Sequence, residues 1–254
     1  MKLKHNNINR LFILLIFSFS FLITVSCKKE KESYLSPGNN NFRDTITDNK
    51  IVDTNKITYL ALGDSYTIGA SVSEQERFPM QLYGMLRDDR ISISTPDIIA
   101  TSGWTTGDLI HALNTNPPGK KYSFVTLLIG VNNQYQGRTL EEYKAQFTQL
   151  LNLAISYADN IKNHVFVLSI PDYSVTPFAL WSDTLKIARE IDQFNEANKN
   201  ISLDAGVNYV DITPISREAK NDPSLIAGDG LHPSAAQYYR WDKLLESMVV
   251  EEIH

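Results

Sequence analysis

The chain has 254 residues, of which 43% are hydrophobic and 21% are charged, and its formal net charge at pH 7 is −5. A chain of this length and composition can bury a hydrophobic core of its own and needs no disulfide to fold. The acidic balance and the absence of a basic stripe argue against nucleic-acid binding, which depends on clustered Lys and Arg side chains.

The first 27 residues have the pattern of an export signal. The basic residues Lys2, Lys4 and Arg10 precede an uninterrupted apolar and hydroxyl run over 11–26. This run is shorter than the ~20 residues that a membrane-spanning helix needs. Its removal would leave 21 basic and 29 acidic residues, a net charge of −8.

The end of this signal contains the only cysteine of the chain. Thr24-Val25-Ser26-Cys27 is followed at once by polar residues. The tetrapeptide resembles a bacterial lipobox, although Thr24 stands where Leu is usual. The resemblance implies a signal peptide over 1–27 and lipidation of Cys27, which would anchor the protein in the bacterial cell envelope. An ordinary signal peptide with an incidental cysteine is the alternative.

Residues 28–55 have the composition of a flexible linker. They are rich in Lys, Glu, Ser, Asn and Asp, include Pro37 and Gly38, and contain few apolar residues. Such a segment buries too little apolar surface to offset the entropy lost on ordering. We therefore expect one folded domain over 56–254.

Within this domain, apolar runs alternate with stretches of helical spacing. Strands are expected at 57–62, 98–100, 124–129, 165–170 and 207–210. Helices are expected from Pro79, over 106–113, from Thr139, over 184–203 and from Ser234. Two of the expected helices begin with a capping-box pair, Thr139 with Glu142 and Ser234 with Gln237.

The alternation predicts an α/β fold, a three-layer α/β/α arrangement around a central, roughly five-stranded parallel sheet. Ligands bind such sheets at the carboxyl ends of the strands. Reactive side chains are therefore expected directly after the apolar runs.

Gly63-Asp64-Ser65 follows the first expected strand. A serine on a tight turn between strand and helix can present its hydroxyl above the sheet edge, where a neighbouring base can activate it. Gly, Asp and Ser are also common turn residues, so this tripeptide alone does not define a nucleophile.

Asp229 and His232 lie just before the last expected helix. A carboxylate three residues away can hold one imidazole nitrogen and leave the other free to act as a base. A simple helix-entry turn, with Gly230 and Pro233 as turn formers, is the alternative.

Gly103 and Asn132 follow the second and third expected strands. The backbone N–H of Gly103 and the side-chain amide of Asn132 are the kinds of donor that stabilise a developing oxyanion. Taken separately, each is equally compatible with a loop glycine or a strand-ending asparagine turn.

Taken together, GDS at 63–65, Gly103, GVNN at 130–133 and DGLH at 229–232 resemble the four sequence blocks of the SGNH (GDSL-type) hydrolases. The resemblance extends from Ile57 to the C-terminus and implies a flavodoxin-like fold and serine esterase activity without a cofactor. It implies that Ser65 is the nucleophile, that His232 is the base and that Asp229 orients His232. The oxyanion hole would combine the N–H groups of Ser65 and Gly103 with the Asn132 side chain. Asn133 departs from the family, which usually has Asp there.

Three loop aromatics, Trp104, Tyr135 and Trp181, are expected near the site and are candidates for stacking on a sugar or an acyl chain. No Cys or His cluster has metal-ligand spacing, so no metal is expected.

The expected substrates are small-molecule esters, acylated glycans or lipids, with short-chain acyl or acetylated carbohydrate esters foremost. An acyltransferase, a lysophospholipase and an inactive surface binding module are the alternatives. A flavodoxin-type electron carrier is disfavoured, because Gly63-Asp64-Ser65 is too short and too acidic to cradle a phosphate.

Overall fold

The computed structural model describes residues 56–253, so the predicted signal peptide, Cys27 and the whole of the predicted linker lie outside the described residues. Five strands form one sheet in which all neighbours are parallel, in the order β2-β1-β3-β4-β5. The strands are β1 (Tyr59–Gly63), β2 (Asp97–Ala100), β3 (Phe124–Leu128), β4 (Val165–Leu168) and β5 (Asn208–Val210). This strand order is the flavodoxin-like one, and the predicted fold class is confirmed.

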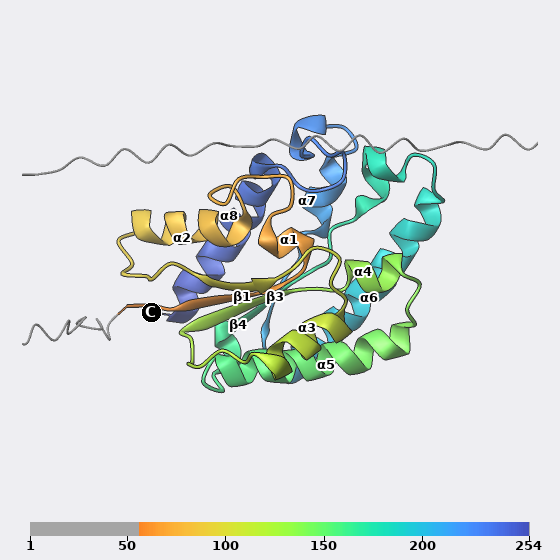
Figure 1. Ribbon diagram of the computed structural model, residues 1–254. Coiled ribbons are helices and arrows are strands. Elements are labelled where there is room, and N and C mark those ends of the chain that lie inside the picture. The colour runs from red at the N-terminus through yellow and green to blue at the C-terminus, as the bar shows by residue number, and fades with distance from the viewer. Residues whose placement is uncertain (1–55, 254) are drawn as a thin grey trace, which may run out of the picture. The chain divides into compact units, whose positions relative to one another are not determined.

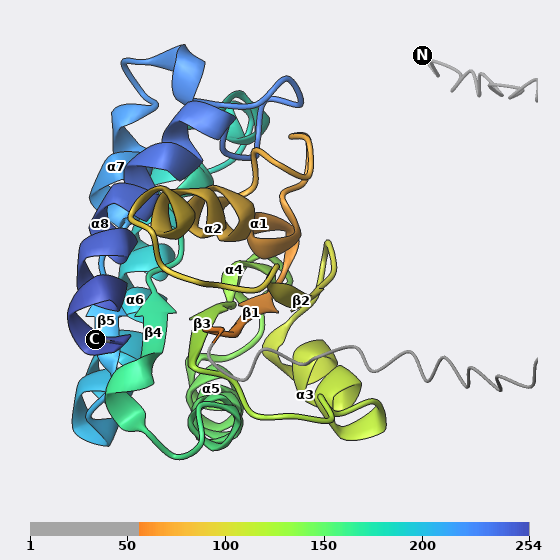
Figure 2. The ribbon, with the colours of Figure 1, turned by 90° about the vertical axis from the view of Figure 1, so that its left-hand side faces the viewer.

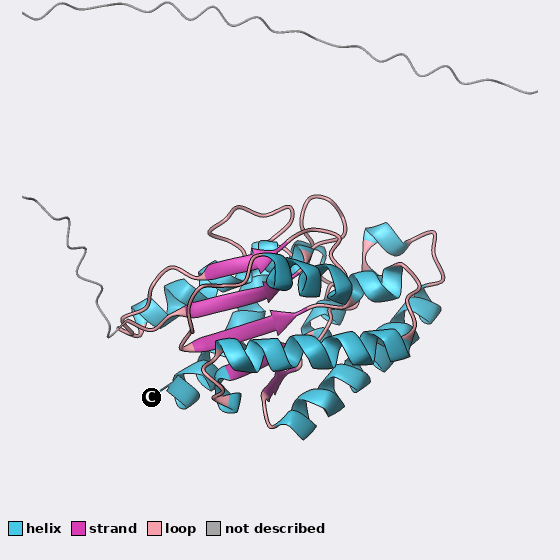
Figure 3. Ribbon diagram, turned by 60° about the horizontal axis from the view of Figure 1, so that its bottom comes forward, coloured by secondary structure: helices cyan, strands magenta, loops and turns pink. Residues whose placement is uncertain are grey.

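Helices cover both faces of the sheet (Figures 1 and 2). On one face, α2 (Phe78–Asp88) packs against α8 (Ala235–Ile253). On the other face, α5 (Leu140–Tyr157) packs between α3 (Thr106–Thr115) and α6 (Thr184–Ala205). Figure 3 shows the helices of this second face in front of the strands.

The three central strands are almost entirely apolar because both of their faces are covered. Every residue of β1, β3 and β4 is buried, which is the pattern of strands between two helical layers. The residues of β2 and β5, at the two sheet edges, are mostly only partly buried. Among residues 56–253, no helix has both the length and the apolar character to cross a bilayer.

Several short elements were not predicted from the sequence. They are α1 (Ser65–Ile68), α4 (Val131–Tyr135), α7 (Thr213–Glu218) and the 3₁₀ turns η1 (Lys162–His164), η2 (Tyr173–Val175), η3 (Pro177–Ala179) and η4 (Pro223–Leu225). Each spans less than two turns, too little for a helical period to show in the sequence. Two of them, α1 and α4, come just after strands and carry Ser65 and Asn132.

The two predicted capping boxes form only in part. Thr139 and Ser234 accept hydrogen bonds from the backbone N–H groups of Glu142 and Gln237. The Gln237 side chain, however, donates to the Leu225 carbonyl oxygen instead of returning to its own helix start. A complete capping box occurs at the start of α3, where it was not predicted, between Thr105 and Asp108.

Candidate active site

Ser65 is the first residue of α1, at the carboxyl end of the central strand β1. Asp64 caps this short helix, and its Oδ1 accepts a hydrogen bond from the Tyr66 N–H at 3.0 Å. The backbone N–H of a residue at this position has no acceptor within the helix. The turn therefore presents both the hydroxyl and the N–H of Ser65 at the sheet edge.

Only glycine fits at the residue that ends β1. A Cβ atom on Gly63 would lie 2.1 Å from Thr67 Oγ1 and 2.4 Å from the Leu128 carbonyl oxygen. The absence of a side chain therefore allows α1 to fold tightly back against the end of β3. Gly63 sets the position of Ser65 through this close approach.

Asp64 is a buried carboxyl group directly beside the candidate nucleophile. Burial raises its pKa to about 7, against the lowering effect of the N–H groups of Tyr66 and Gly130. No hydrogen-bond partner for its second oxygen, Oδ2, is found in the described part of the chain. A carboxyl group in such surroundings is favoured in its neutral form.

Asp229 and His232 form the pair that the sequence predicted. His232 Nδ1 lies 2.5 Å from Asp229 Oδ2. Asp229 Oδ1 accepts from the N–H groups of Leu231 and His232, at 2.9 and 3.0 Å. Ser71 Oγ donates to Asp229 Oδ2 at 2.7 Å, a contact that the sequence did not suggest because 158 residues separate the two.

The surroundings of Asp229 keep it ionised. Burial alone would raise its pKa, but the hydrogen bonds from His232, Ser71 and the backbone outweigh burial and hold the pKa well below its usual range. An ionised Asp229 keeps a proton on Nδ1 of His232, so that Nε2 is left as the acceptor.

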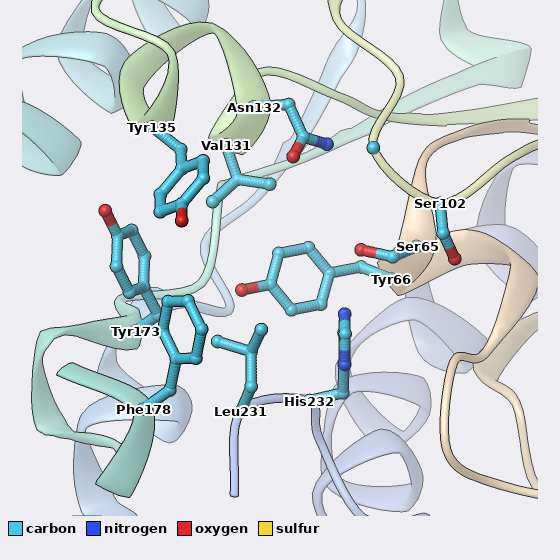
Figure 4. A pocket seen from close by; sticks show the side chains of 11 residues that line it. Ser65, Tyr66, Ser102, Val131, Asn132, Tyr135, Tyr173, Phe178, Leu231 and His232 are labelled. Atoms are coloured by element: carbon cyan, nitrogen blue, oxygen red, sulfur yellow. The ribbon is translucent and has the colours of Figure 1, made fainter. Parts of the chain in front are cut away.

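Ser65 and His232 face the same cavity from opposite ends of the folded chain. Figure 4 shows the outer nitrogen of the His232 ring directed toward the Ser65 side chain. No hydrogen bond joins their side chains within residues 56–253, as is common before a substrate is bound. The Tyr66 ring packs edge-on against the imidazole, with the ring centroids 5.7 Å apart.

Asn132 lies on the side of Ser65 opposite to His232 (Figure 4). It is the second residue of α4, and its Nδ2 donates to the Trp104 carbonyl oxygen at 2.9 Å. This bond uses one amide hydrogen and leaves the other for a ligand. Gly103, which precedes Trp104, lines the same cavity and has φ of 87°, a conformation that favours glycine.

Asn133 links α4, the helix of Asn132, to the start of α3, which follows the loop of Gly103. Its Oδ1 accepts from the Thr106 N–H at 3.0 Å, and its Nδ2 donates to Thr106 Oγ1 at 2.7 Å. The Thr106 hydroxyl donates in turn to Gln146 Oε1 at 2.5 Å. An ionised Asp at position 133, as is usual in the family, could only accept both bonds. The departure from the family pattern therefore changes the direction of one bond and keeps the connection.

The cavity has a volume of about 190 Å³. Of the predicted site residues it brings together Ser65, Gly103, Asn132, His232 and Tyr135. The remaining lining residues, which were not predicted, are Tyr66, Ser102, Val131, Tyr173, Phe178 and Leu231. In residues 56–253, no three His, Cys, Asp or Glu side chains are grouped as a metal would require.

The other two predicted aromatics do not line this cavity. Trp104 acts on the site only indirectly, because its carbonyl oxygen accepts a hydrogen bond from Asn132. The Trp181 side chain is 97% exposed and lies outside it. Of the lining residues that were missed, those within reach of sequence analysis adjoin a motif residue: Tyr66, Ser102, Val131 and Leu231.

The sequence model described as GDSL-like Lipase/Acylhydrolase family matches residues 61–240, most of the chain. The chain belongs to this family. The match spans Ser65, Asn132, Asp229 and His232, so the family resemblance drawn from the motifs is confirmed. Membership places this GDSL-like protein among lipases and acylhydrolases. No curated protein is similar enough in sequence to be counted as a relative.

Several solved structures share the fold of this GDSL-like chain. The lipase Lip_vut3 from a goat rumen metagenome is 19% identical, with a TM-score of 0.62 over 78% of this chain and 100% of its own. TesA is 16% identical, with a TM-score of 0.61 over 76% and 97%. Axe2, an acetylxylan esterase from Geobacillus stearothermophilus, is 21% identical, with a TM-score of 0.57 over 78% and 94%. At identities this low, the structural likeness establishes a common fold and nothing further.

Proposed function

We propose that the protein is a serine esterase that hydrolyses carboxylic esters through an acyl-enzyme, with Ser65 as the nucleophile. The observation that carries this proposal is the convergence of Ser65, Asn132 and the hydrogen-bonded His232–Asp229 pair at one cavity. Membership of a lipase and acylhydrolase family supports the same reaction.

In the proposed mechanism, Asp229 holds the proton on Nδ1 of His232, and Nε2 takes the proton of the Ser65 hydroxyl. The Ser65 oxygen attacks the ester carbonyl carbon, and the negative charge moves to the carbonyl oxygen. Three donors would stabilise this oxyanion by hydrogen bonds: the N–H groups of Ser65 and Gly103 and the free amide hydrogen of Asn132. These donors are already held in place, so little reorganisation is needed.

His232 then acts as an acid to complete formation of the acyl-enzyme, and as a base again in its hydrolysis. His232 gives its proton to the leaving alcohol oxygen as the bond from carbon to that oxygen breaks. A water molecule then loses a proton to His232 and attacks the acyl-enzyme. His232 returns this proton to the Ser65 oxygen as the bond from that oxygen to the acyl carbon breaks, and the carboxylic acid is released.

The proposed substrates are esters of short-chain acids, with acetylated carbohydrates as a further class. The fold shared with an acetylxylan esterase supports the second class. Acyl transfer would use the same residues with a sugar hydroxyl in place of water, and a lysophospholipase would act on a lipid ester. Analysis of the products formed with and without added sugar acceptors separates transfer from hydrolysis.

We place the protein in the bacterial cell envelope, anchored through a lipid on Cys27, with residues 28–55 as the tether. The lipobox-like segment ending at Cys27 supports this placement. In cell fractionation, we expect the wild-type protein in the membrane fraction and the Cys27→Ala protein in the soluble fraction. Equal distribution of the two proteins would rule out the anchor.

The test of the proposed function is covalent labelling of the nucleophile. A fluorophosphonate probe should label the wild-type protein and a Ser247→Ala control, which removes an exposed serine of α8. Ser65→Ala should lose both labelling and ester hydrolysis. Near wild-type hydrolysis by purified Ser65→Ala would exclude Ser65 as the nucleophile, and an unlabelled, inactive wild-type protein would support a binding module.

A further inference from the structure

The cavity beside Ser65 is larger and more apolar than an acetyl group requires. Its volume is about 190 Å³, whereas a cavity of ~150 Å³ in another protein accommodates a benzene ring. Beyond the candidate catalytic residues, its walls are apolar or aromatic except for Ser102, and no Lys, Arg, Asp or Glu side chain of residues 56–253 lines it. The methyl group of an acetyl ester would leave most of this space unfilled.

The far end of the cavity consists of three aromatic rings, those of Tyr135, Tyr173 and Phe178 (Figure 4). Tyr135 lies 6.3 Å from Tyr173 and 6.0 Å from Phe178 between ring centroids, and Tyr173 and Phe178 are 6.3 Å apart. Each ring therefore contacts the other two. Together they offer an apolar surface at the end of a path that begins at Ser65.

This aromatic end is held in place relative to the candidate catalytic residues. The hydroxyl group of Tyr173 donates to Gln134 Oε1 at 2.9 Å, which ties Tyr173 to α4, the helix of Asn132. The Phe178 N–H donates to the Gly230 carbonyl oxygen at 3.0 Å, which ties η3 to the loop of His232. The distance from the reacting carbon to the three rings is thus set by backbone and buried side-chain contacts.

The position of the cavity indicates which half of an ester it receives. In Figure 4, Asn132 lies on one side of Ser65 and His232 on the other, and the apolar side chains lie to a third side. The oxyanion must face Asn132, and the leaving alcohol oxygen must lie near His232 to receive its proton. The acyl group is the remaining substituent of the reacting carbon, and it points into the cavity.

We propose that this cavity is an acyl-binding site for uncharged, apolar acyl groups of about six carbons, and that Tyr135 and Phe178 set the preferred length. The inference rests on the proposed esterase function and revises its substrate class, since the cavity favours esters of medium-length or ring-containing acids over short-chain and acetylated ones. Each methylene group placed in an apolar site raises kcat/KM about fourfold. The four methylene groups that separate hexanoyl from acetyl then give a gain on the order of 10²-fold.

The first experiment compares three alkyl esters by titration of the released acid. Ethyl hexanoate and hexyl acetate are isomers that carry the six-carbon chain on the acyl and the alcohol side, and ethyl acetate has neither chain. We expect kcat/KM for ethyl hexanoate to exceed that for ethyl acetate by on the order of 10²-fold. It should exceed that for hexyl acetate at least tenfold. Equal or faster hydrolysis of ethyl acetate, or a preference for hexyl acetate, would overturn the assignment. Failure of the wild-type protein to cleave any ester would instead refute the esterase function.

The second experiment tests the two selectivity residues. Tyr135 and Phe178 are 60% and 47% exposed, so their truncation to alanine should leave the fold intact. We expect Tyr135→Ala and Phe178→Ala each to lower the ratio of kcat/KM for ethyl hexanoate over ethyl acetate about fivefold to tenfold. Tyr239→Ala, at a tyrosine of α8 that is 52% exposed and outside the cavity, is the matched control and should keep the wild-type ratio. The ratio is independent of the fraction of folded enzyme, and an unchanged ratio in both cavity variants would refute their role.

Discussion

The buried carboxyl group of Asp64 should make the stability of the protein depend on pH. Burial raises the pKa of Asp64 to about 7 in the folded protein, whereas an aspartate in an unfolded chain has a pKa of about 3.9. The folded state therefore binds this proton more tightly than the unfolded state does. Its contribution to stability is fully present below pH ~4, is lost as the pH rises to about 7, and stays lost above that pH.

The magnitude follows from the size of this shift. A difference of about three pKa units corresponds to up to about 4 kcal/mol in the free energy of unfolding. Asparagine at position 64 keeps an oxygen that can accept from the Tyr66 N–H, yet it has no proton to lose in this range. Relative to wild type, Asp64→Asn should therefore gain up to about 4 kcal/mol between pH 4 and pH 8.

The assay is denaturant unfolding of both proteins at half-unit steps from pH 4 to pH 8. Other titrating groups contribute to both proteins, so the difference between the two isolates Asp64. Asp204→Asn, at an exposed position of α6, is the matched control and should differ from wild type by a constant amount. A constant difference for Asp64→Asn, or one that falls as the pH rises, would refute the assignment of a buried, neutral Asp64.

Three further predictions concern the site and its support. Asn132→Ala should lower kcat for ester hydrolysis by about 10²–10³, the usual effect of losing one oxyanion donor. Gly63→Ala should destabilise the fold by about 3 kcal/mol or more in denaturant unfolding, since its Cβ would lie 2.4 Å from a carbonyl oxygen of β3. Asn133→Ala should cost about 1–3 kcal/mol because the buried Thr106 N–H loses its acceptor. Asn133→Asp, which keeps that acceptor, should retain most of the stability and the activity.

Each of these predictions has a clear contrary result. An unchanged kcat in Asn132→Ala would remove this side chain from the oxyanion hole. Gly84→Ala is the control for Gly63, because a Cβ there meets nothing within 4 Å and alanine should stabilise α2 by ~0.5–1 kcal/mol. If the two glycine variants were equally stable, steric crowding at Gly63 would be the wrong explanation. Equal losses in Asn133→Ala and Asn133→Asp would show that the Thr106 contact does not support the site.

The sequence by itself determined the class of fold and the residues around which the candidate site is built. Apolar runs and helical spacing are local properties, so they predicted strands and helices of a parallel sheet without knowledge of their packing. The topology of such a sheet brings the residues that follow its strands to one edge. This is why Ser65, Gly103 and Asn132 could be assigned to one site, and why Asp229 and His232, three residues apart, could be paired.

Only the tertiary structure decided what surrounds these residues. Trp104 and Trp181 were equivalent candidates in the sequence, yet one supports Asn132 through its carbonyl group and the other is almost fully exposed. The contact of Ser71 with Asp229 and the place of Phe178 at the cavity have no local signal. Contacts between distant segments depend on the distances that packing sets between whole elements, and these distances are not encoded in the spacing of residues along any one of them.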